Sequence, residues 1–293
     1  MLKKERSLKA QDVRPPYEKH IERNIGFITW EEQEFLRTSK IAVLGVGGLG
    51  GPLVEQLVRA GSENLLIADH DTFEVSNLNR QLCDQDDLGR SKVNVLEQKM
   101  KFINPQVNIM KISHINQANI EKVLEEVSVV ALTLDDPIIS ILIARICRKK
   151  GIPMLETWAI PYLCAWWFTS ESPSYEECYE LNTEHMEMDE ILNSEDIKMD
   201  VNKTLIPKVL KFPGLKDRLN REPGTLDKMM SGQIGLRSFA PIVRMSASYL
   251  AFELIFSGLL QIKPKILAPN VIGYDYFTMN PLSFSLNGIL EDI

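Results

Sequence analysis

The sequence predicts an α/β protein built on a doubly wound, mostly parallel sheet. Four short apolar runs rich in branched residues have the length and composition of buried strands: residues 40–45, 64–69, 107–112 and 127–134. Three segments with helical periodicity alternate with them: residues 49–60, 91–102 and 137–150. This alternation is typical of a parallel sheet with helices on both faces. Ligands of such sheets bind beyond the carboxyl ends of the strands.

A short helix is expected ahead of the first strand. Thr29 is followed three residues later by Glu32, which is the capping-box pattern of a helix N-terminus. We therefore predict a helix over residues 30–37, within a helical arm that comprises residues 1–38.

The second half of the chain, residues 161–293, extends the same globular domain. Residues 162–170 and 271–277 have the composition of further strands, added to the sheet in antiparallel fashion. Residues 238–260 are apolar nearly all round, which predicts a buried helix. Proline and glycine are scattered with little periodicity over 201–237, so the stretch 171–237 is either a long crossing loop or a small inserted subdomain.

Composition favours a soluble protein in the cytoplasm. The 293 residues are 44% hydrophobic and 25% charged, and no run approaches the roughly 18 apolar residues of a membrane span. The N-terminal stretch mixes acids with bases around no apolar core, so it does not resemble a secretory signal. The 4 cysteines form no C-x-x-C pair, which fits thiols in a reducing compartment better than a disulfide framework.

Negative charge is concentrated in one block. Residues 171–200 hold eleven acidic side chains and the single base Lys198, whereas the whole chain has a net charge of -7. We expect a solvated or mobile surface there; the alternative is a loop that repels nucleic acid or receives a basic partner. No nucleic-acid surface is predicted.

A glycine-rich turn marks the first candidate site. Gly45, Gly47 and Gly50 fit the pattern G-x-G-x-x-G between a strand and a helix, and Gly48 lies within it. Backbone amides and the helix N-terminus at such a turn bind phosphate. Asp69 ends the second strand at the spacing where a carboxylate accepts hydrogen bonds from ribose hydroxyls. Residues 39–160 therefore form a nucleotide-binding half.

Cations after Asp69 favour a triphosphate over a dinucleotide. Arg80 lies eleven residues beyond it, and Lys92 opens the next helix, so both lie on the ligand side of the sheet. A diphosphate carries about two negative charges, but a triphosphate carries about four and recruits arginine, lysine and a divalent metal. Asn77 and Gln81 can orient phosphate oxygens by neutral hydrogen bonds.

The sequence also offers a carboxylate that could bind a metal ion. Asp135 and Asp136 emerge at the end of the fourth strand, at the same rim. A hard cation such as Mg²⁺ takes oxygen ligands there, so Asp135 is the predicted metal ligand. Asp136 precedes Pro137 and is expected to cap the next helix instead.

Together these motifs resemble the ThiF, MoeB and HesA proteins, which are relatives of the ubiquitin-activating enzymes. The shared pattern is G-x-G-G-L-G, then D-x-D-x-x-x-x-S-N-L-x-R-Q, then G-x-x-K and an aspartate that ends the fourth strand. The similarity runs from about Arg23 to the last strand. It implies a homodimer that transfers AMP from ATP to a carboxylate, releasing pyrophosphate and forming an acyl adenylate.

The resemblance also implies roles for individual residues. The glycine loop, Asp69 and Asp71 bind the nucleotide, and Asn77, Arg80 and Gln81 surround its phosphates. Lys92 contacts the phosphates near the reacting centre, and Asp135 holds magnesium. Arg23 resembles the family's N-terminal arginine, which reaches into the partner subunit's site. Since a carboxylate and a phosphate repel each other, this reaction needs charge neutralisation more than a base.

This sequence also departs from the family. Many relatives carry two C-x-x-C pairs for structural zinc, but only Cys178 stands in the comparable stretch here, so no zinc is predicted. Asp136 stands where many relatives have asparagine. Several relatives use a cysteine of the crossing loop covalently; an acidic setting disfavours the Cys178 thiolate, so covalent catalysis is not expected.

The acceptor is left open between two hypotheses. The first is a carboxylate on a peptide or small protein, as in ribosomal-peptide modification. The second is a ubiquitin-like sulfur-carrier C-terminus that is activated for thiocarboxylate formation. Alternatives of other classes are an NAD-dependent oxidoreductase, which Arg80 and Lys92 disfavour, a non-catalytic binding scaffold, and an enzyme of transfer RNA modification.

Overall fold

The computed structural model describes residues 16–287, so the first 15 residues of the predicted arm and residues 288–293 lie outside the described part. Its main sheet has six strands in the order β3-β2-β1-β4-β5-β7. They are β1 (Ile41–Leu44), β2 (Asn64–Ala68), β3 (Asn108–Ile112), β4 (Val129–Leu132), β5 (Met154–Glu156) and β7 (Trp166–Phe168). All neighbours pair in parallel except β7, which is antiparallel to β5. The predicted doubly wound, Rossmann-like sheet with an antiparallel addition is therefore confirmed.

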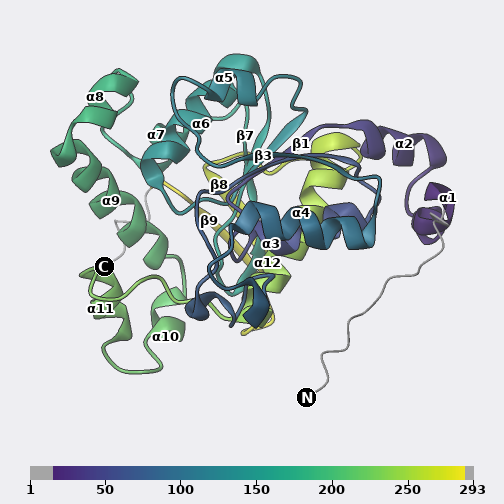
Figure 1. The fold of residues 1–293 in the computed structure, drawn as a ribbon. Helices are drawn as coiled ribbons and strands as arrows, with labels where there is room; N and C mark the ends of the chain where they lie inside the picture. Colours follow the sequence, from purple (N-terminus) through teal and green to yellow (C-terminus); the bar gives the residue numbers. More distant parts are fainter. Residues whose placement is uncertain (1–15, 288–293) are drawn as a thin grey trace.

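Helices cover both faces of this sheet. Side chains of alternate strand residues enter two separate hydrophobic clusters, because successive side chains of a strand point to opposite faces. One cluster includes α3 (Gly50–Arg59), α4 (Lys92–Ile103) and α12 (Ala240–Glu253). The other includes α5 (Ile120–Val123) and α6 (Pro137–Lys150). Figure 1 shows these two groups of helices on opposite sides of the strands, with α5 and α6 at the top.

The segment predicted as an acidic crossing loop is largely helical. It contains α7 (Tyr175–Tyr179), α8 (Met188–Asn193), α9 (Glu195–Leu210), α10 (Leu215–Leu219) and α11 (Thr225–Met230). The side chains of Ser174 and Ser194 cap α7 and α9. The Arg145 guanidinium on α6 lies 2.6 Å from the buried Glu176 carboxylate and so fixes α7 to the main fold. Of the eleven acidic residues in 171–200, Glu176 is buried and the other ten are exposed, as expected of a solvated surface. Helices α8–α11 form a lobe at the left of Figure 1.

A second, smaller sheet follows the main one. Its order is β6-β8-β9, with β6 (Tyr162–Cys164), β8 (Asn270–Asp275) and β9 (Asn280–Ser285) all antiparallel. The single strand predicted over 162–170 is divided at Ala165, since β6 and β7 enter different sheets. Strands β5 and β9 were not predicted.

The apolar C-terminal helix is buried, as predicted. It comprises α12 and a π-helical continuation, η4 (Leu254–Leu259). The expectation that no segment is long enough for a membrane span needs correction, because Ala240–Leu259 has 20 residues with a mean hydropathy of 1.3. However, 61% of this stretch is buried inside the fold, as in a core helix.

Between residue 16 and the first strand lie three short helices: α1 (Tyr17–Ile21), η1 (Glu22–Asn24) and α2 (Trp30–Thr38). The predicted capping box at α2 is confirmed. The Glu32 amide donates to the Thr29 hydroxyl at 3.1 Å, and the Thr29 amide donates to the Glu32 carboxylate at 2.7 Å. Two further short helices, η2 (Val75–Asn77) and η3 (Gln85–Asp87), follow β2.

Candidate active site

The glycine turn between β1 and α3 is too tight for side chains. A Cβ atom on Gly50 would lie 1.8 Å from the Gly45 carbonyl oxygen, and one on Gly45 would lie 2.5 Å from the Thr133 carbonyl oxygen. Gly45 also has a φ of +97°, which L side chains rarely adopt. The Thr133 hydroxyl donates to the Gly45 carbonyl oxygen at 2.6 Å and fixes the turn. The α3 N-terminus is thereby presented at the carboxyl end of the sheet.

Asp69 connects this turn to the neighbouring strand. One oxygen of its carboxylate accepts from the Val46 amide at 2.9 Å, and the other accepts from the Asp71 amide at 2.9 Å. Because both hydrogen bonds come from backbone groups, the carboxylate is held in a single orientation at the end of β2. A ligand hydroxyl can still donate to its remaining lone pairs.

Lys92, the first residue of α4, is buried between two carboxylates. Its ammonium lies 2.7 Å from the Asp71 carboxylate and 4.0 Å from the Asp69 carboxylate. Burial raises the pKa of Asp71, but the hydrogen bond and charge of Lys92 outweigh it, so the pKa is below its usual value. Asp71 is therefore ionised at neutral pH, and the positive charge of Lys92 offsets its negative charge.

Arg80 lies beside the glycine turn. Its guanidinium donates to the Ser76 carbonyl oxygen at 3.0 Å and to the Asn79 side-chain oxygen at 2.8 Å. A Cβ atom on Gly48 would lie 3.4 Å from its Nε atom. Within residues 16–287 Arg80 forms no ion pair with an acidic side chain, so its charge is available to an anion at the turn.

Gln81 and Asn77 are both buried, but in different ways. Among the residues that the structure describes, the Gln81 side-chain oxygen has no hydrogen-bond partner although it is buried, which is costly unless a ligand supplies a donor. The Asn77 side-chain oxygen accepts from the Glu74 amide at 3.1 Å and closes the turn that carries Arg80. Gln81 therefore contributes to the site directly, and Asn77 shapes the loop.

Asp135 and Asp136 have different surroundings: the predicted cap at Asp136 is confirmed, and the metal role of Asp135 stays a prediction. Asp136 accepts from the Ile138 amide at 2.9 Å and from the Ile139 amide at 3.1 Å, and so caps α6. The Asp135 carboxylate is exposed and forms no ion pair or hydrogen bond within the described residues. An exposed, unpartnered carboxylate at this rim fits an Mg²⁺ ion that keeps several waters.

A single cavity of about 390 Å³ brings these residues together at the carboxyl ends of the strands. Of the residues predicted from the sequence, nine line it: Gly45, Gly47, Gly48, Asp69, Asp71, Arg80, Gln81, Lys92 and Asp135. Gly50 shapes its wall from behind, and Asn77 supports it through the loop. Such a volume and mixed lining are typical of small-molecule sites.

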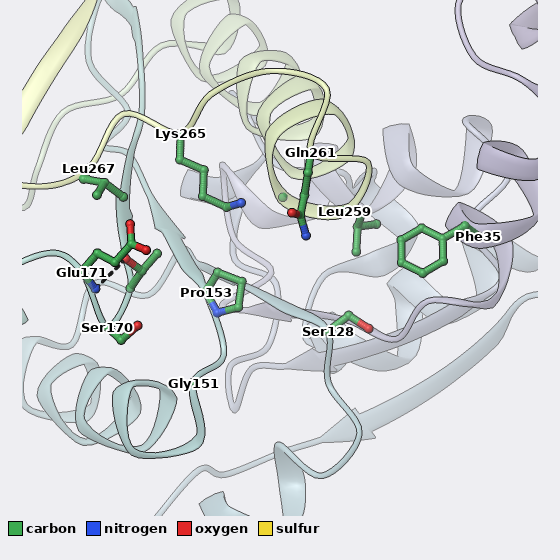
Figure 2. Close-up of a pocket in the computed structure, with 12 residues that line it drawn as sticks. Phe35, Ser128, Gly151, Pro153, Ser170, Glu171, Leu259, Gln261, Lys265 and Leu267 are labelled. Atoms are coloured by element: carbon green, nitrogen blue, oxygen red, sulfur yellow. Dashed lines mark hydrogen bonds between the residues drawn. The ribbon is translucent and has the colours of Figure 1, made fainter.

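A second cavity, of about 510 Å³, lies at the opposite edge of the sheet. Figure 2 shows it between Ser128 and Pro153, which precede β4 and β5, and the loop that carries Gln261 and Lys265. The Lys265 ammonium lies 5.4 Å from the centre of the Trp167 ring, a cation–π contact. Gly45, Gly47 and Gly48 of the glycine turn and Leu49, the N-cap residue of α3, line the other cavity, at the carboxyl ends of the strands, so the nucleotide site is assigned there.

Arg23 lies far from this cavity within the chain. It is exposed in η1, and the neighbouring Asn24 side chain donates to the Ala60 carbonyl oxygen at 3.0 Å, at the C-terminal end of α3. The glycine turn is at the other end of this 10-residue helix, roughly 15 Å away. Arg23 is therefore not part of the site formed by its own chain.

Glu156 is a site residue that the sequence did not reveal. It ends β5, lines the cavity and is buried; burial raises its pKa to about 7. Its carboxyl group accepts from the Tyr179 hydroxyl at 2.6 Å, the Trp166 indole at 3.0 Å and the Tyr175 hydroxyl at 3.4 Å. A sequence prediction of strand β5 would have identified Glu156, because acidic residues at the carboxyl ends of parallel strands lie at the ligand-binding edge of the sheet.

The cysteines lack the environment of nucleophiles. Cys178 is buried in α7, and burial raises the pKa of its thiol to about 12; burial has the same effect on Cys147 and Cys164. Cys83 is partly exposed, and burial again raises its pKa. Since the thiolate is the reactive form, none of the four is poised to attack a substrate.

Comparison with known proteins reveals relatives of this chain. SAMP-activating enzyme E1 of Haloferax volcanii is 33% identical over 128 residues, which are 43% of this chain and 47% of that protein. Adenylyltransferase and sulfurtransferase UBA4 of Lodderomyces elongisporus is 36% identical over 121 residues, 41% of this chain and 27% of that protein. The chain thus spans less than half the length of these curated relatives.

The fold has solved counterparts. The crystal structure of E. coli MccB with ATP matches with a TM-score of 0.62 at 18% identity, covering 87% of this chain and 66% of MccB. At that identity the likeness shows a shared fold. The ThiF family profile matches residues 21–288. Because this match covers most of the sequence, the protein belongs to the ThiF family.

Proposed function

We propose that this protein is an ATP-dependent adenylyltransferase that activates a carboxylate of a peptide or small protein. The observation that carries the proposal is the convergence, in one cavity, of the glycine turn, the fixed Asp69 carboxylate and the cations Arg80 and Lys92. Membership of the ThiF family supports it, as do relatives named as activating enzymes and as an adenylyltransferase.

The chemistry follows from this arrangement. ATP binds with its ribose at Asp69 and its phosphates along the glycine turn. An oxygen of the acceptor carboxylate attacks the α-phosphorus, and the bond from that phosphorus to the bridging oxygen breaks. Pyrophosphate leaves with the electron pair, and the acceptor becomes an acyl adenylate. Arg80 and Lys92 stabilise the negative charge that builds up on the phosphates, so no base or covalent nucleophile of the chain is required.

Asp135 is the residue that would hold magnesium. When bound, the ion neutralises phosphate charge and orients the leaving pyrophosphate. The fit is supported by the unpartnered Asp135 carboxylate, which shares the cavity with Lys92. No zinc is part of this proposal.

We further propose that the protein is a homodimer in the cytoplasm. Arg23 is exposed and lies at the end of α3 opposite the glycine turn. It can therefore contribute charge only to the site of a second copy of the chain.

The acceptor is a peptide or small protein in the first hypothesis. Microcin C7 biosynthetic enzyme MccB, which shares the fold, has been solved with ATP and with N-formylated MccA. The second hypothesis is a ubiquitin-like sulfur-carrier C-terminus, and the names of the two curated relatives favour it. The raised pKa of Cys178, about 12, does not support a sulfur transfer through that thiol.

Exchange of labelled pyrophosphate into ATP tests the function. Carboxylate peptides and sulfur-carrier proteins are added one at a time with Mg²⁺, and Lys92→Ala serves as the inactive control. We expect exchange that depends on one acceptor class and is lost in the variant. Binding of ATP without exchange for any acceptor would contradict adenylation and leave only the nucleotide site.

A further inference from the structure

We propose that the cavity selects an acceptor whose activated carboxylate is the C-terminal α-carboxylate of a bulky apolar residue. The inference rests on the proposed function, because it assigns the part of the same cavity that ATP does not need. It names the acceptor by its chemistry and thereby goes beyond carboxylate activation in general.

The cavity continues from the glycine turn to an apolar wall. This wall is formed by six side chains: Trp158, Leu210, Leu215, Leu219, Met229 and Leu236. Trp158 follows β5, and the others belong to α9–α11 and the segment after them. Leu210, Leu215 and Met229 are almost fully buried, whereas Leu236 is 41% exposed at the mouth. The helices of the segment 171–237, which was predicted as a crossing loop, therefore form one side of a pocket.

Charge is distributed unevenly along this cavity. The acidic lining residues lie at the carboxyl ends of main-sheet strands: Glu156 ends β5, and Asp69, Asp71 and Asp135 come after β2 and β4. The six wall side chains carry no charge, but Arg237, beside Leu236, also lines the cavity; it is exposed and forms no ion pair in the described part of the chain. A charged acceptor side chain buried among the six wall side chains would lose its hydration, and only an acidic one that stayed near Arg237 would meet an opposite charge.

A C-terminal apolar residue matches both the polar and the apolar side of the cavity. Its carboxylate and its side chain are attached to the same Cα atom, so the two groups must contact neighbouring polar and apolar surfaces. The cavity has Arg80 and Lys92 on the polar side and the apolar wall on the other. Burying an apolar side chain contributes roughly 25 cal/mol per Å² of its surface. A terminal glycine would forgo this contribution, and a terminal aspartate would oppose it.

The test uses acetylated tripeptides, Ac-Gly-Ala-X, with a free C-terminal carboxylate and X as Leu, Phe, Gly or Asp. Two measurements are made on the full chain with Mg²⁺ and ATP. One is kcat/KM for pyrophosphate exchange, and the other is the Kd of the peptides in competition with a fluorescent Leu peptide. We expect the Leu and Phe peptides to exceed the Gly and Asp peptides by about ten-fold in both.

Two surface variants test whether the apolar wall causes the preference for the Leu peptide. Leu236→Asp places a charge at the mouth of the pocket, and Met230→Asp is the matched control, since Met230 is 40% exposed but lies outside the cavity lining. Leu236→Asp should remove the preference for the Leu peptide, and Met230→Asp should keep it. Both should bind ATP normally.

The outcomes separate this inference from the proposed function. Peptide binding with a Leu and Phe preference but no exchange would keep the pocket and overturn adenylation. Exchange or binding that is equal for all four peptides, or no peptide binding at all, overturns the pocket. Equal effects of the two variants on the preference would also overturn it.

Discussion

The Lys92 ammonium lies 2.7 Å from the Asp71 carboxylate and 4.0 Å from the Asp69 carboxylate, so one buried cation holds two acids at the rim of the sheet. Lys92→Met leaves these acids unneutralised beside the phosphates of ATP. We expect pyrophosphate exchange to fall about 100-fold or more, as when a charge-stabilising donor is removed from an active site.

Lys99→Met is the matched control for this prediction. Lys99 is on the same helix and pairs with Asp84 at 2.9 Å and Asp87 at 2.8 Å, outside the cavity lining. Its loss changes the net charge equally but should leave exchange within a few-fold of normal. Equal loss in both variants would show that overall charge, and not position, matters.

Two glycines of the turn should respond differently to alanine. A Cβ atom on Gly50 meets backbone at 1.8 Å, so Gly50→Ala should disrupt the turn and lower the free energy of unfolding. A Cβ atom on Gly47 meets only the Gln81 side chain, at 3.7 Å. Gly47→Ala should therefore fold normally and weaken ATP binding, because its methyl group enters the phosphate cradle. Denaturant unfolding and calorimetric ATP titration measure the two effects; a stable Gly50→Ala protein would refute the steric argument.

Substituting the adjacent acids Asp135 and Asp136 should have opposite effects: one change should affect activity and the other stability. Asp135→Ala should abolish Mg²⁺-dependent exchange with unchanged stability, since the carboxylate has no partner in the described structure. Asp136→Ala removes the cap of α6 and should cost about 1 kcal/mol of stability while exchange persists. Urea unfolding and exchange assays on both variants check this. The reverse pattern would assign the metal to Asp136.

Arg23 should complement a damaged site in trans. Each Arg23→Ala or Asp135→Ala homodimer should be inactive, but mixed subunits should regain about one working site per heterodimer. A mixture of Lys92→Ala and Asp135→Ala is the control without rescue, because both residues line the cavity of a single chain. Absence of rescue in the first mixture would place the action of Arg23 within its own subunit or limit it to structure.

Glu156 should make stability depend on pH. Burial raises its pKa from 4.5 to about 7, so between these values the folded state binds more protons than the unfolded state. Stability contributed by this group therefore falls as pH rises from about 5 to 7. Glu156→Gln keeps a neutral acceptor for Tyr179 and should become more stable than the wild type by up to about 3 kcal/mol at pH 8.

The comparison of the two proteins at pH 5 and pH 8 checks the sign. The difference in unfolding free energy should be small at pH 5 and large at pH 8. A difference that is constant with pH would show that Glu156 is already ionised when folded.

Much of the proposed nucleotide-binding part of the cavity could be predicted from the sequence, because its residues come directly after predicted strands. Gly45, Asp69 and Asp135 each follow a buried strand, and parallel strands bring their carboxyl ends together. Strand order and helical period were therefore sufficient. The prediction of Asp136 as a cap likewise needed only the proline that follows it.

The acceptor end could not be predicted in the same way. Helices α9–α11 bury scattered apolar residues against several neighbours, so their sequence lacks the regular stripe of an amphipathic helix. Strand β5 has three residues, too few to show a period, and the place of Glu156 depends on it. The burial of Cys178 and Glu176 comes from long-range packing that no local pattern records.

The packing of α12 also limits how the molecule can be dissected. Leu250 and Leu254 share a hydrophobic cluster with Leu53 of the helix after the glycine turn. A fragment ending at residue 160 would expose that cluster to water and lose its partner helix. The smallest autonomous folding unit thus reaches at least to Leu259, and attempts to express the nucleotide half alone should yield aggregated protein.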